Sequence, residues 1–299
     1  METRKTIRKT FRDFFWTVFT KLSRKKATEY RMNRNVGYKV NLDDPKTLNE
    51  KIQWLKLNTY YKNPLVTQCS DKYLVRDFVK EKIGDSTLIE LFGVYDTPED
   101  IDWDKLPKEF VLKCNHGSGG NIICHDKDKL DKDEVKRKLS KWLKDDYGPS
   151  RVEFAYDDIK RKIIAEKFIE TEDGLPPKDY KIFCSYGKPK FLFVASDRVG
   201  NNTKFDFFTP EWEWLPVKNS HENAKEMIEK PKDFDKMLEY ASRLSAEFPI
   251  VRVDFYYEFG KIIFGELTFL HFGGVRPFTP IKYDRIFGDL LPIDKEFRK

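Results

Sequence analysis

The chain has 299 residues, of which 35% are charged and 15% aromatic. This length and composition allow a sizeable core, divided over two lobes, and exclude a disordered chain. No run of about eighteen apolar residues and no secretory signal pattern occurs, so we expect no membrane-spanning helix. The four cysteines have no regular spacing, which favours a reducing, cytoplasmic compartment over a disulfide framework.

The positive charge is concentrated at the N-terminus. Residues 1–26 carry nine basic side chains against two acidic ones, a net charge of +7, which leaves the other 273 residues at −1. Such a tail is not the spread of basic residues that a nucleic-acid partner needs. Apolar residues recur in the tail at helical spacing and predict a basic amphipathic helix. Binding to an anionic membrane, at its cytoplasmic face, and docking on the body of the protein are both open. The apolar residues are Ile7, Phe11, Phe14, Phe15, Val18, Phe19 and Leu22.

Further along the chain, two early helices have clear boundary signals. One is predicted over residues 43–58, where Thr47 and Glu50 have capping-box spacing and Pro45 suits an early position. Another is predicted over residues 71–82, ending at Gly84. The remaining expected elements are a strand near 88–94, a helix at 129–144, strands at 162–170, 178–187 and 188–197, a loop or edge strand at 205–216, and a helix at 233–248.

A glycine-rich turn at residues 116–120 lies between two apolar strands in the stretch EFVLKCNHGSGGNIIC. Such a turn lets backbone N–H groups converge on an anion. Lys113 precedes it, on the face opposite Phe110 and Leu112, and adds a mobile positive charge. The stretch is not a Walker P-loop, because GxxxxGK[ST] is absent.

The same stretch contains four side chains of zinc-binding type. They are close in sequence, but no C-x-x-C pair is present. Small buried thiols are therefore the favoured interpretation, with a zinc site as the alternative. The four residues are Cys114, His116, Cys124 and His125.

Residues 250–274 predict a β-hairpin whose strands, 251–258 and 261–269, are joined at Phe259-Gly260. Alternation puts Arg252, Asp254 and Tyr256 on one face of the first strand. Regular alternation along the second strand puts four residues on one face: Ile262, Phe264, Glu266 and Thr268.

A hairpin centred on Gly260 places Asp254 opposite Glu266 and Arg252 opposite Thr268. Two facing carboxylates repel each other, so the pair needs a proton, a cation or water. A divalent cation with oxygen ligands is the economical answer. A solvated hairpin face is the alternative.

Five segments in this order resemble the ATP-grasp superfamily, and specifically the TupA-like ATP-grasp proteins of bacterial surface-polysaccharide loci. They are LNEKIQWLKL, FVLKCNHGSG, KIIAEKFIE, FPIVRVDFY and FGELTF. The resemblance implies an α+β ATP-grasp fold, in which two α+β lobes clamp a nucleotide, with a helical N-terminal extension. The expected divisions are the amphipathic N-terminal helix (1–35), a mostly helical segment (36–108), a small lobe with the glycine-rich hairpin (109–170) and a large lobe with the metal-binding hairpin (171–299).

The resemblance also implies roles for single residues around ATP and Mg²⁺. Lys72 and Lys113 contact phosphates, and the turn over them consists of His116, Gly117, Ser118, Gly119 and Gly120. The adenine faces Glu166, Lys167 and Ile169, and Asp179 serves the ribose. The metal is held by Asp254, Glu266 and Thr268. Arg252, with Lys113, stabilises the transferred phosphoryl group.

Two departures from the family pattern concern the metal site and the acceptor side. Thr268 stands where many ATP-grasp enzymes have Asn. The run Leu270-His271-Phe272-Gly273-Gly274 replaces an expected Thr-Pro-Gly-Ser-Gly-like run, so His271 is either an acceptor contact or a packing residue.

The implied function is an ATP- and Mg²⁺-dependent ligase that forms an amide through an acylphosphate. It joins an amine or amino acid to a carboxylate of a surface polysaccharide or its precursor, and the basic tail suits a lipid-linked acceptor. Three alternatives remain open: a kinase acting on a sugar hydroxyl, a glycosyltransferase of a polysaccharide locus, and a catalytically impaired scaffold.

Overall fold

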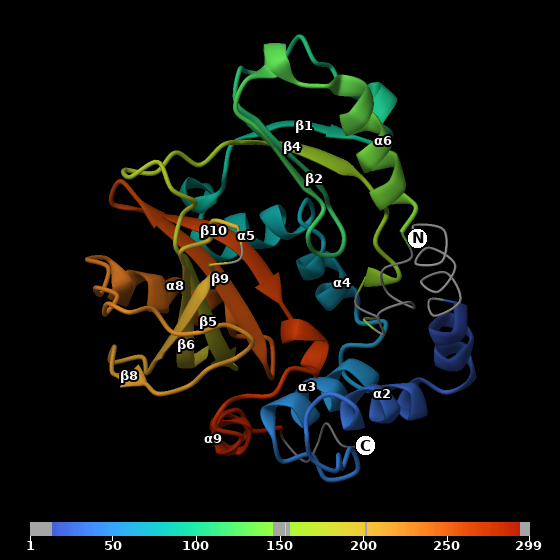
Figure 1. Ribbon diagram of the computed structural model, residues 1–299, viewed down its shortest axis with the longest axis vertical. Helices are drawn as coiled ribbons and strands as arrows, with labels where there is room; N and C mark the ends of the chain where they lie inside the picture. The colour runs from blue at the N-terminus through green and yellow to red at the C-terminus, as the bar shows by residue number, and fades with distance from the viewer. Residues whose placement is uncertain (1–13, 146–152, 154–155, 201, 294–299) are drawn as a thin grey trace.

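The computed structural model describes residues 14–145, 153, 156–200 and 202–293. Helices surround two antiparallel sheets (Figure 1), which is the α+β architecture that the sequence predicts. The small sheet has the order β1-β4-β2-β3 and the large sheet the order β10-β9-β5-β6-β7-β8. The strands of the small sheet are β1 (Leu91–Tyr95), β2 (Phe110–Cys114), β3 (Asn121–Cys124) and β4 (Ile163–Lys167). Those of the large sheet are β5 (Asp179–Ser185), β6 (Lys188–Ser196), β7 (Lys204–Phe208), β8 (Trp214–Leu215), β9 (Val251–Glu258) and β10 (Lys261–Thr268).

One helix, α6 (Lys132–Leu143), covers the small sheet. Its buried residues Val135 and Leu139 pack in one cluster with Phe110 and Leu112 of β2. Strand β1 joins this sheet by pairing with β4, although it precedes residue 109, where we expect the small lobe to begin. The turn-rich segment 171–177 connects the two sheets, from β4 to β5.

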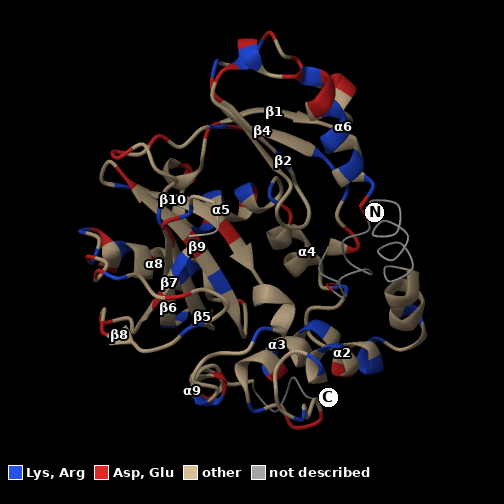
Figure 2. Cartoon of the chain, in the orientation of Figure 1, with Lys and Arg blue, Asp and Glu red and all other residues tan. Residues whose placement is uncertain are grey.

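The large sheet packs one face against α8 (Phe234–Ser245). Val251, Val253 and Phe255 point to this side and belong to the main core together with Leu244. The alternation of β9 thus leaves Arg252, Asp254 and Tyr256 on the opposite face, as the sequence predicts. Charged residues of both signs lie on β9 and β10 where the large sheet approaches α5 (Val75–Ile83) (Figure 2).

Helix α3 (Leu48–Leu57) begins with the expected capping box of Thr47 and Glu50. Its buried polar side chains form hydrogen bonds with the segment that follows β10. Asn49 donates to Asp284 (2.8 Å) in α9 (Lys282–Leu290), and the side-chain amide of Gln53 donates to the carbonyls of Gly273 (2.6 Å) and Gly274 (2.9 Å). The motif LNEKIQWLKL therefore fixes the chain after β10, beginning with η5 (His271–Gly274).

Several expected helix boundaries are wrong by a few residues. Helix α3 starts after Pro45, and α5 starts at Val75 because residues 71–74 form a turn capped by Asp71. The single helix expected at the N-terminus is interrupted at Ser23, which caps α2 (Arg24–Asn33). Residues 1–13 of that prediction lie outside the described residues. Residues 205–216 form most of an edge hairpin, and α4 (Pro64–Ser70) was not expected.

Candidate active site

The hairpin of β9 and β10 pairs Asp254 with Glu266 and Arg252 with Thr268, as the sequence predicts. The register near the turn differs by one residue, and a bulge at Gly265 restores the pairing. The expectation that Phe264 shares a face with Glu266 is therefore wrong. A bulge inserts one unpaired residue, so Phe264 points into the core while Glu266 points to the opposite side.

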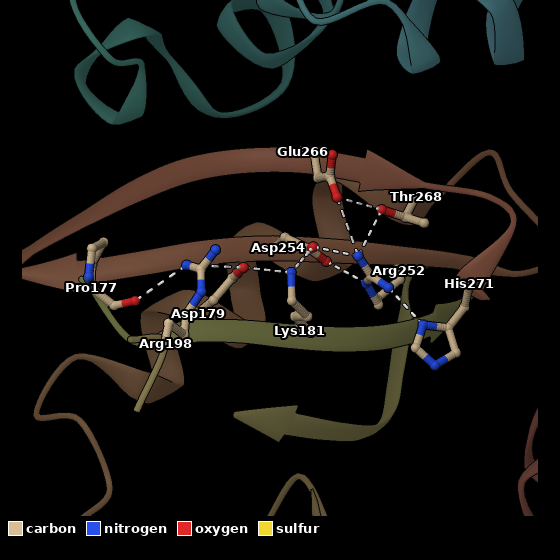
Figure 3. A network of polar contacts seen from close by, with 9 residues as sticks. All are labelled: Pro177, Asp179, Lys181, Arg198, Arg252, Asp254, Glu266, Thr268 and His271. Carbon is tan, nitrogen blue, oxygen red and sulfur yellow. Dashed lines mark hydrogen bonds and ion pairs between the residues drawn. The ribbon is translucent and has the colours of Figure 1, made fainter. Parts of the chain in front are cut away.

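Asp254 is the centre of a network of charges across three strands (Figure 3). Both of its carboxylate oxygens accept hydrogen bonds from the Arg252 guanidinium, at 2.7 and 2.6 Å. Nζ of Lys181 lies 2.5 Å from Oδ2 of the same carboxylate. Arg252 also donates to Thr268 (2.9 Å) and reaches Glu266 (3.3 Å). One guanidinium thus joins both carboxylates of the hairpin.

The repulsion between Asp254 and Glu266 is already compensated by these protein cations. With this geometry the two facing carboxylates therefore need no metal for charge balance. The donor set still fits Mg²⁺, which binds through one or two carboxylates plus substrate phosphates. The Glu266 side chain keeps 42% of its surface exposed, and Thr268 donates to it at 3.1 Å.

Lys181 is the main charged residue that the sequence reasoning missed. It comes from β5, which pairs with β9 so that Lys181 lies opposite Asp254. Its ammonium also contacts Asp179 (2.6 Å), which Arg198 approaches at 3.7 Å. Asp179 is buried at 4% exposure and serves as a counter-ion here, while its ribose role stays a prediction. The signal was present: Asp179 and Lys181 alternate with apolar residues along one strand.

His271 is buried and holds Arg252 from the side opposite Asp254. Its Nδ1 lies 2.7 Å from Nη1 of Arg252 and must accept, because arginine only donates. Its Nε2 therefore carries the proton and donates to Asn219 (3.0 Å), which donates to the carbonyl of Pro277 (3.0 Å). Burial, with the charges of Arg252 and Lys181, lowers the pKa of His271 well below its usual value. A neutral imidazole at 3% exposure positions Arg252.

On the small-sheet side, the turn that carries Lys72 is tied to the glycine-rich loop. The Lys72 ammonium donates to the carbonyl of Gly117 (2.5 Å), and its backbone N–H donates to the carbonyl of Asn115 (2.9 Å). The fully buried Asn115 side chain donates to Asp71 (2.8 Å) and accepts from the N–H of Lys162 (2.7 Å). Asn115 therefore fixes the loop and Lys72 in one arrangement.

Lys113 pairs across the small sheet with Glu166, whose Oε2 lies 2.8 Å from its ammonium. Arg76 of α5 approaches the other oxygen of Glu166 at 3.5 Å. Because Glu166 is buried, its carboxylate holds the Lys113 ammonium in a fixed position. Arg76, like Lys181, was not singled out from the sequence.

The glycine-rich loop rests against α6. A Cβ atom on Gly120 would lie 3.5 Å from the Trp142 ring, and Gly117 and Gly119 have φ values of 68° and 83°, which favour glycine. Burial, together with the charges of Arg161 and Lys72, lowers the pKa of His116 to about 4. His116 is therefore a neutral, buried side chain at the base of the loop.

Glu266 is the carboxylate on which cations of the large sheet and Lys72 of the turn before α5 act together. Partial burial raises the pKa of Glu266, whose side chain is 42% exposed, but the positive charges of Lys72, Lys181 and Arg252 outweigh this effect and lower it to about 2. Burial lowers the pKa of Lys72, and Glu266 is the strongest charge that opposes this shift. Lys113 also acts on Lys72. Lys72 is thus electrostatically coupled to Glu266 of the hairpin and to Lys113 of the small sheet. The region of these groups and Asp254 is the candidate active site, called the cleft below.

A pocket of about 400 Å³ lies near the turn of the β9–β10 hairpin. It lies between the end of β4 and the β9–β10 turn, and its lining includes Lys167, Ile169 and Ile263. The N–H of Lys167 already donates to the carbonyl of Glu90 (2.9 Å), so it is not available to read a base. Glu166 pairs with Lys113 and is not part of this lining.

The four zinc-type side chains do not form a metal site. Cys114 and Cys124 are buried in the small-sheet core, at 4% and 2% exposure. His125 is exposed and packs against Phe168, with ring centroids 4.9 Å apart. Within the described part of the chain, no three or more His, Cys, Asp or Glu side chains gather in a metal-binding group.

Comparisons with known proteins give one family and a set of distant structures. Residues 50–292 match the family model described as TupA-like ATPgrasp. A search of curated proteins finds no match. Similar solved structures include an L-amino acid ligase from Bacillus licheniformis, with 15% identity and a TM-score of 0.49 over 86% of this chain and 58% of that one.

Two further structures are a D-alanine–D-alanine ligase from Bacillus anthracis complexed with ATP and the ATP-grasp ligase PsnB. The first has 20% identity and a TM-score of 0.38, over 68% of this chain and 55% of that one. The second has 11% identity and a TM-score of 0.46, over 80% and 62%. The chain thus spans somewhat more than half the length of these ligases. The family match, which covers most of the sequence, shows that the chain belongs to the TupA-like ATP-grasp family.

Proposed function

We propose that the protein is an ATP- and Mg²⁺-dependent ligase that joins an amine or amino acid to a carboxylate. The observation that carries this proposal is that three cations act on Glu266: Lys72 from the turn before α5, and Arg252 and Lys181 from the large sheet. Fixed cations beside carboxylates suit a metal–triphosphate unit, whose transfer chemistry depends on positioning and charge neutralisation.

Each part of the cleft has a role in this proposal. Asp254, Glu266 and Thr268 hold Mg²⁺, which when bound neutralises charge on the phosphates. Lys72 and Lys113 bind the phosphates, and the N–H groups of residues 116–120 cover them. Arg252, held by His271 and Asp254, stabilises charge on the transferred phosphoryl group.

The nucleoside part of ATP occupies the pocket at the end of β4 in this proposal. The backbone of Ile169 and the carbonyl of Lys167 read the adenine, since the N–H of Lys167 is engaged with Glu90. Asp179, paired with Lys181 and Arg198, serves the ribose only if those pairs rearrange.

The proposed reaction has two steps. The carboxylate oxygen of the acceptor attacks the γ-phosphorus of ATP, and ADP leaves. The amine then attacks the acyl carbon of the acylphosphate, and inorganic phosphate leaves. Arg252 and Lys113 remain charged throughout, because neither step requires them to give up a proton.

The acceptor class follows from the sequence resemblance to proteins of surface-polysaccharide loci. We propose a carboxylate of a surface glycan or of its precursor, free or lipid-linked, as the acceptor in the cytoplasm. A screen of ADP release against pairs of uronic acids and amines tests this directly. ADP is expected only when both partners are present, and mass spectrometry should identify an amide.

Matched variants link the activity to the cleft. Glu266→Gln is expected to lose ADP release by about a hundredfold or more, the scale of a lost transition-state contact. The control Glu226→Gln removes the same charge at an exposed position in a loop before α8. This variant should retain full activity. Equal activity of both variants would show that Glu266 takes no part in the reaction.

The same assays distinguish the other functions. A kinase releases ADP without an amine and yields a phosphate ester on a sugar hydroxyl. A glycosyltransferase consumes a sugar nucleotide and leaves ATP intact. A scaffold shows no Mg²⁺-dependent ATP binding by calorimetry. Any of these three results overturns the ligase proposal.

A further inference from the structure

The helix at residues 14–22 presents an apolar face to solvent. Phe14, Phe15, Val18 and Leu22 are 65%, 48%, 39% and 80% exposed. Residues 14, 18 and 22 are four apart and lie on one side of a helix. We call these four residues the outward face. The helix lies at the edge of the molecule (Figure 1), and its ribbon is almost free of charged residues in Figure 2.

The opposite side of this helix already docks on the protein. The rings of Trp16 and Phe19 lie 6.0 and 5.9 Å from Tyr30 of α2, and the Arg31 guanidinium lies 5.8 Å from the Trp16 ring. Thr20, on the same side, is 3% exposed. The two alternatives for this helix are therefore compatible, because docking on the body leaves the outward face unused.

Basic residues lie next to the outward face in the sequence. Lys21, Arg24 and Lys26 are exposed, and residues 1–26 have a net charge of +7. An anionic lipid surface matches both features, since apolar side chains enter below the headgroups while lysine and arginine contact lipid phosphates. A second copy of the chain matches poorly, because two such faces would bring like charges together.

We propose that the outward face inserts into the headgroup region of an anionic membrane while Trp16 and Phe19 hold the helix on α2. The catalytic cleft plays no part in this binding. The protein is thereby held at the surface without a spanning segment, and no described helix is both long and apolar enough to span a bilayer.

Vesicle flotation of the full chain tests the proposal. The protein is expected to bind phosphatidylglycerol-containing vesicles, to bind phosphatidylcholine vesicles much more weakly, and to dissociate as salt is raised. Phe14→Ser with Leu22→Ser should lower the partition coefficient by about a hundredfold or more, since each exposed side chain of this size gains at least about tenfold on burial. Lys21→Gln with Lys26→Gln should lower it by about fivefold for each charge removed.

Two controls separate this site from the rest of the surface. Met227→Ser with Ile286→Ser removes exposed apolar residues elsewhere (69% and 42% exposed) and should leave partition unchanged. Glu266→Gln should also bind vesicles normally, so failure of the ligase proposal does not affect this result. Urea unfolding of each variant checks that the fold is intact.

Three results would overturn the proposal. They are equal binding to both vesicle types, unchanged binding of the Phe14→Ser/Leu22→Ser variant, and concentration-dependent self-association that the same substitutions abolish. The last result would assign the outward face to a second copy of the chain.

Discussion

Lys181 connects two buried carboxylates on neighbouring strands. Its ammonium lies 2.6 Å from Asp179 and 2.5 Å from Asp254, whose side chains are 5% and 1% exposed. Removing one partner of a buried ion pair leaves an uncompensated charge, which costs about 3–5 kcal/mol. Lys181 therefore affects both folding and the charge of the cleft.

We expect Lys181→Met to lower the free energy of unfolding by about 3 kcal/mol and ATP turnover by about two orders of magnitude. The double variant Lys181→Met/Asp179→Asn should regain most of the stability, because a surplus carboxylate is removed, but not the turnover. Urea unfolding and ADP release measure the two effects. Lys188→Met, at an exposed position of β6, serves as the control. Parallel recovery of stability and turnover in the double variant would assign Lys181 a structural role alone.

Substitutions of the two hairpin carboxylates are expected to differ in their effect on stability and to have the same effect on activity. Asp254 is buried and receives three charge-assisted contacts, whereas the Glu266 side chain is 42% exposed. Asp254→Asn should therefore cost about 3 kcal/mol of stability, and Glu266→Gln about 1 kcal/mol or less. Both should lose turnover by about a hundredfold or more. Equal unfolding midpoints in urea would contradict the asymmetry.

At the scale of single elements, the hairpin shows what the sequence predicts well. Its turn and the face of β9 follow from alternation and from the position of Gly260. The local sequence pattern predicts these features because the two strands are adjacent in the chain. The predicted pairing of Asp254 with Glu266 holds because the bulge at Gly265 offsets the register error near the turn. The bulge at Gly265 was missed, since a glycine in a strand is compatible with both a regular and a bulged ladder.

The contributions of β5 and η5 were harder to predict, because they depend on which strands are neighbours. Lys181 meets Asp254 only when β5 pairs with β9 across about seventy intervening residues, and no local pattern encodes that order. His271 was considered, but its role depends on Asn219, a residue in an irregular segment. Sequence reasoning thus found the residues on the hairpin and missed their long-range partners.

The bulge at Gly265 leaves no room for a side chain. A Cβ atom there would lie 3.1 Å from the carbonyl oxygen of Asp254 and 3.3 Å from the Tyr256 ring. Gly265→Ala is therefore expected to shift the backbone beside Asp254, to cost about 1–3 kcal/mol, and to lower ADP release. Gly174→Ala, in the open linker at a φ of +70°, costs about 1 kcal/mol through strain and should leave turnover unchanged. Normal turnover of Gly265→Ala would show that the bulge does not position Asp254 and Glu266 for the proposed reaction.

At the scale of the whole molecule, the two buried histidines determine how the stability of the fold responds to pH. His116 lies at the base of the glycine-rich loop beside the small sheet, and His271 of η5 contacts Arg252 of the large sheet. One neutral imidazole thus lies beside each sheet. Burial is the main cause that lowers both pKa values. Acidification should therefore destabilise both sides of the cleft.

The sign of this effect follows from proton binding in the two states. Below about pH 6.5 the histidines of an unfolded chain take up protons, whereas native His116 stays neutral down to about pH 4 and His271 also resists protonation. At these two positions the unfolded state then binds more protons, so their contribution to stability is full above pH 6.5 and falls as the pH is lowered. The slope should approach about 1.4 kcal/mol per pH unit for each histidine.

Urea unfolding between pH 5 and 8 measures this slope above the range in which carboxylates titrate in the unfolded chain. His271→Asn is expected to lower stability at every pH, because Arg252 loses its acceptor, and at the same time to reduce the slope below pH 6.5 by about half. His116→Asn should reduce the slope by a similar amount. A variant with both substitutions should lose the histidine part of the slope and keep only the dependence that comes from other groups, such as buried Lys56, whose pKa burial lowers to about 7. An unchanged slope in the double variant would mean that the two imidazoles are protonated in the native protein, and the hydrogen-bond directions assigned around Arg252 would then be wrong.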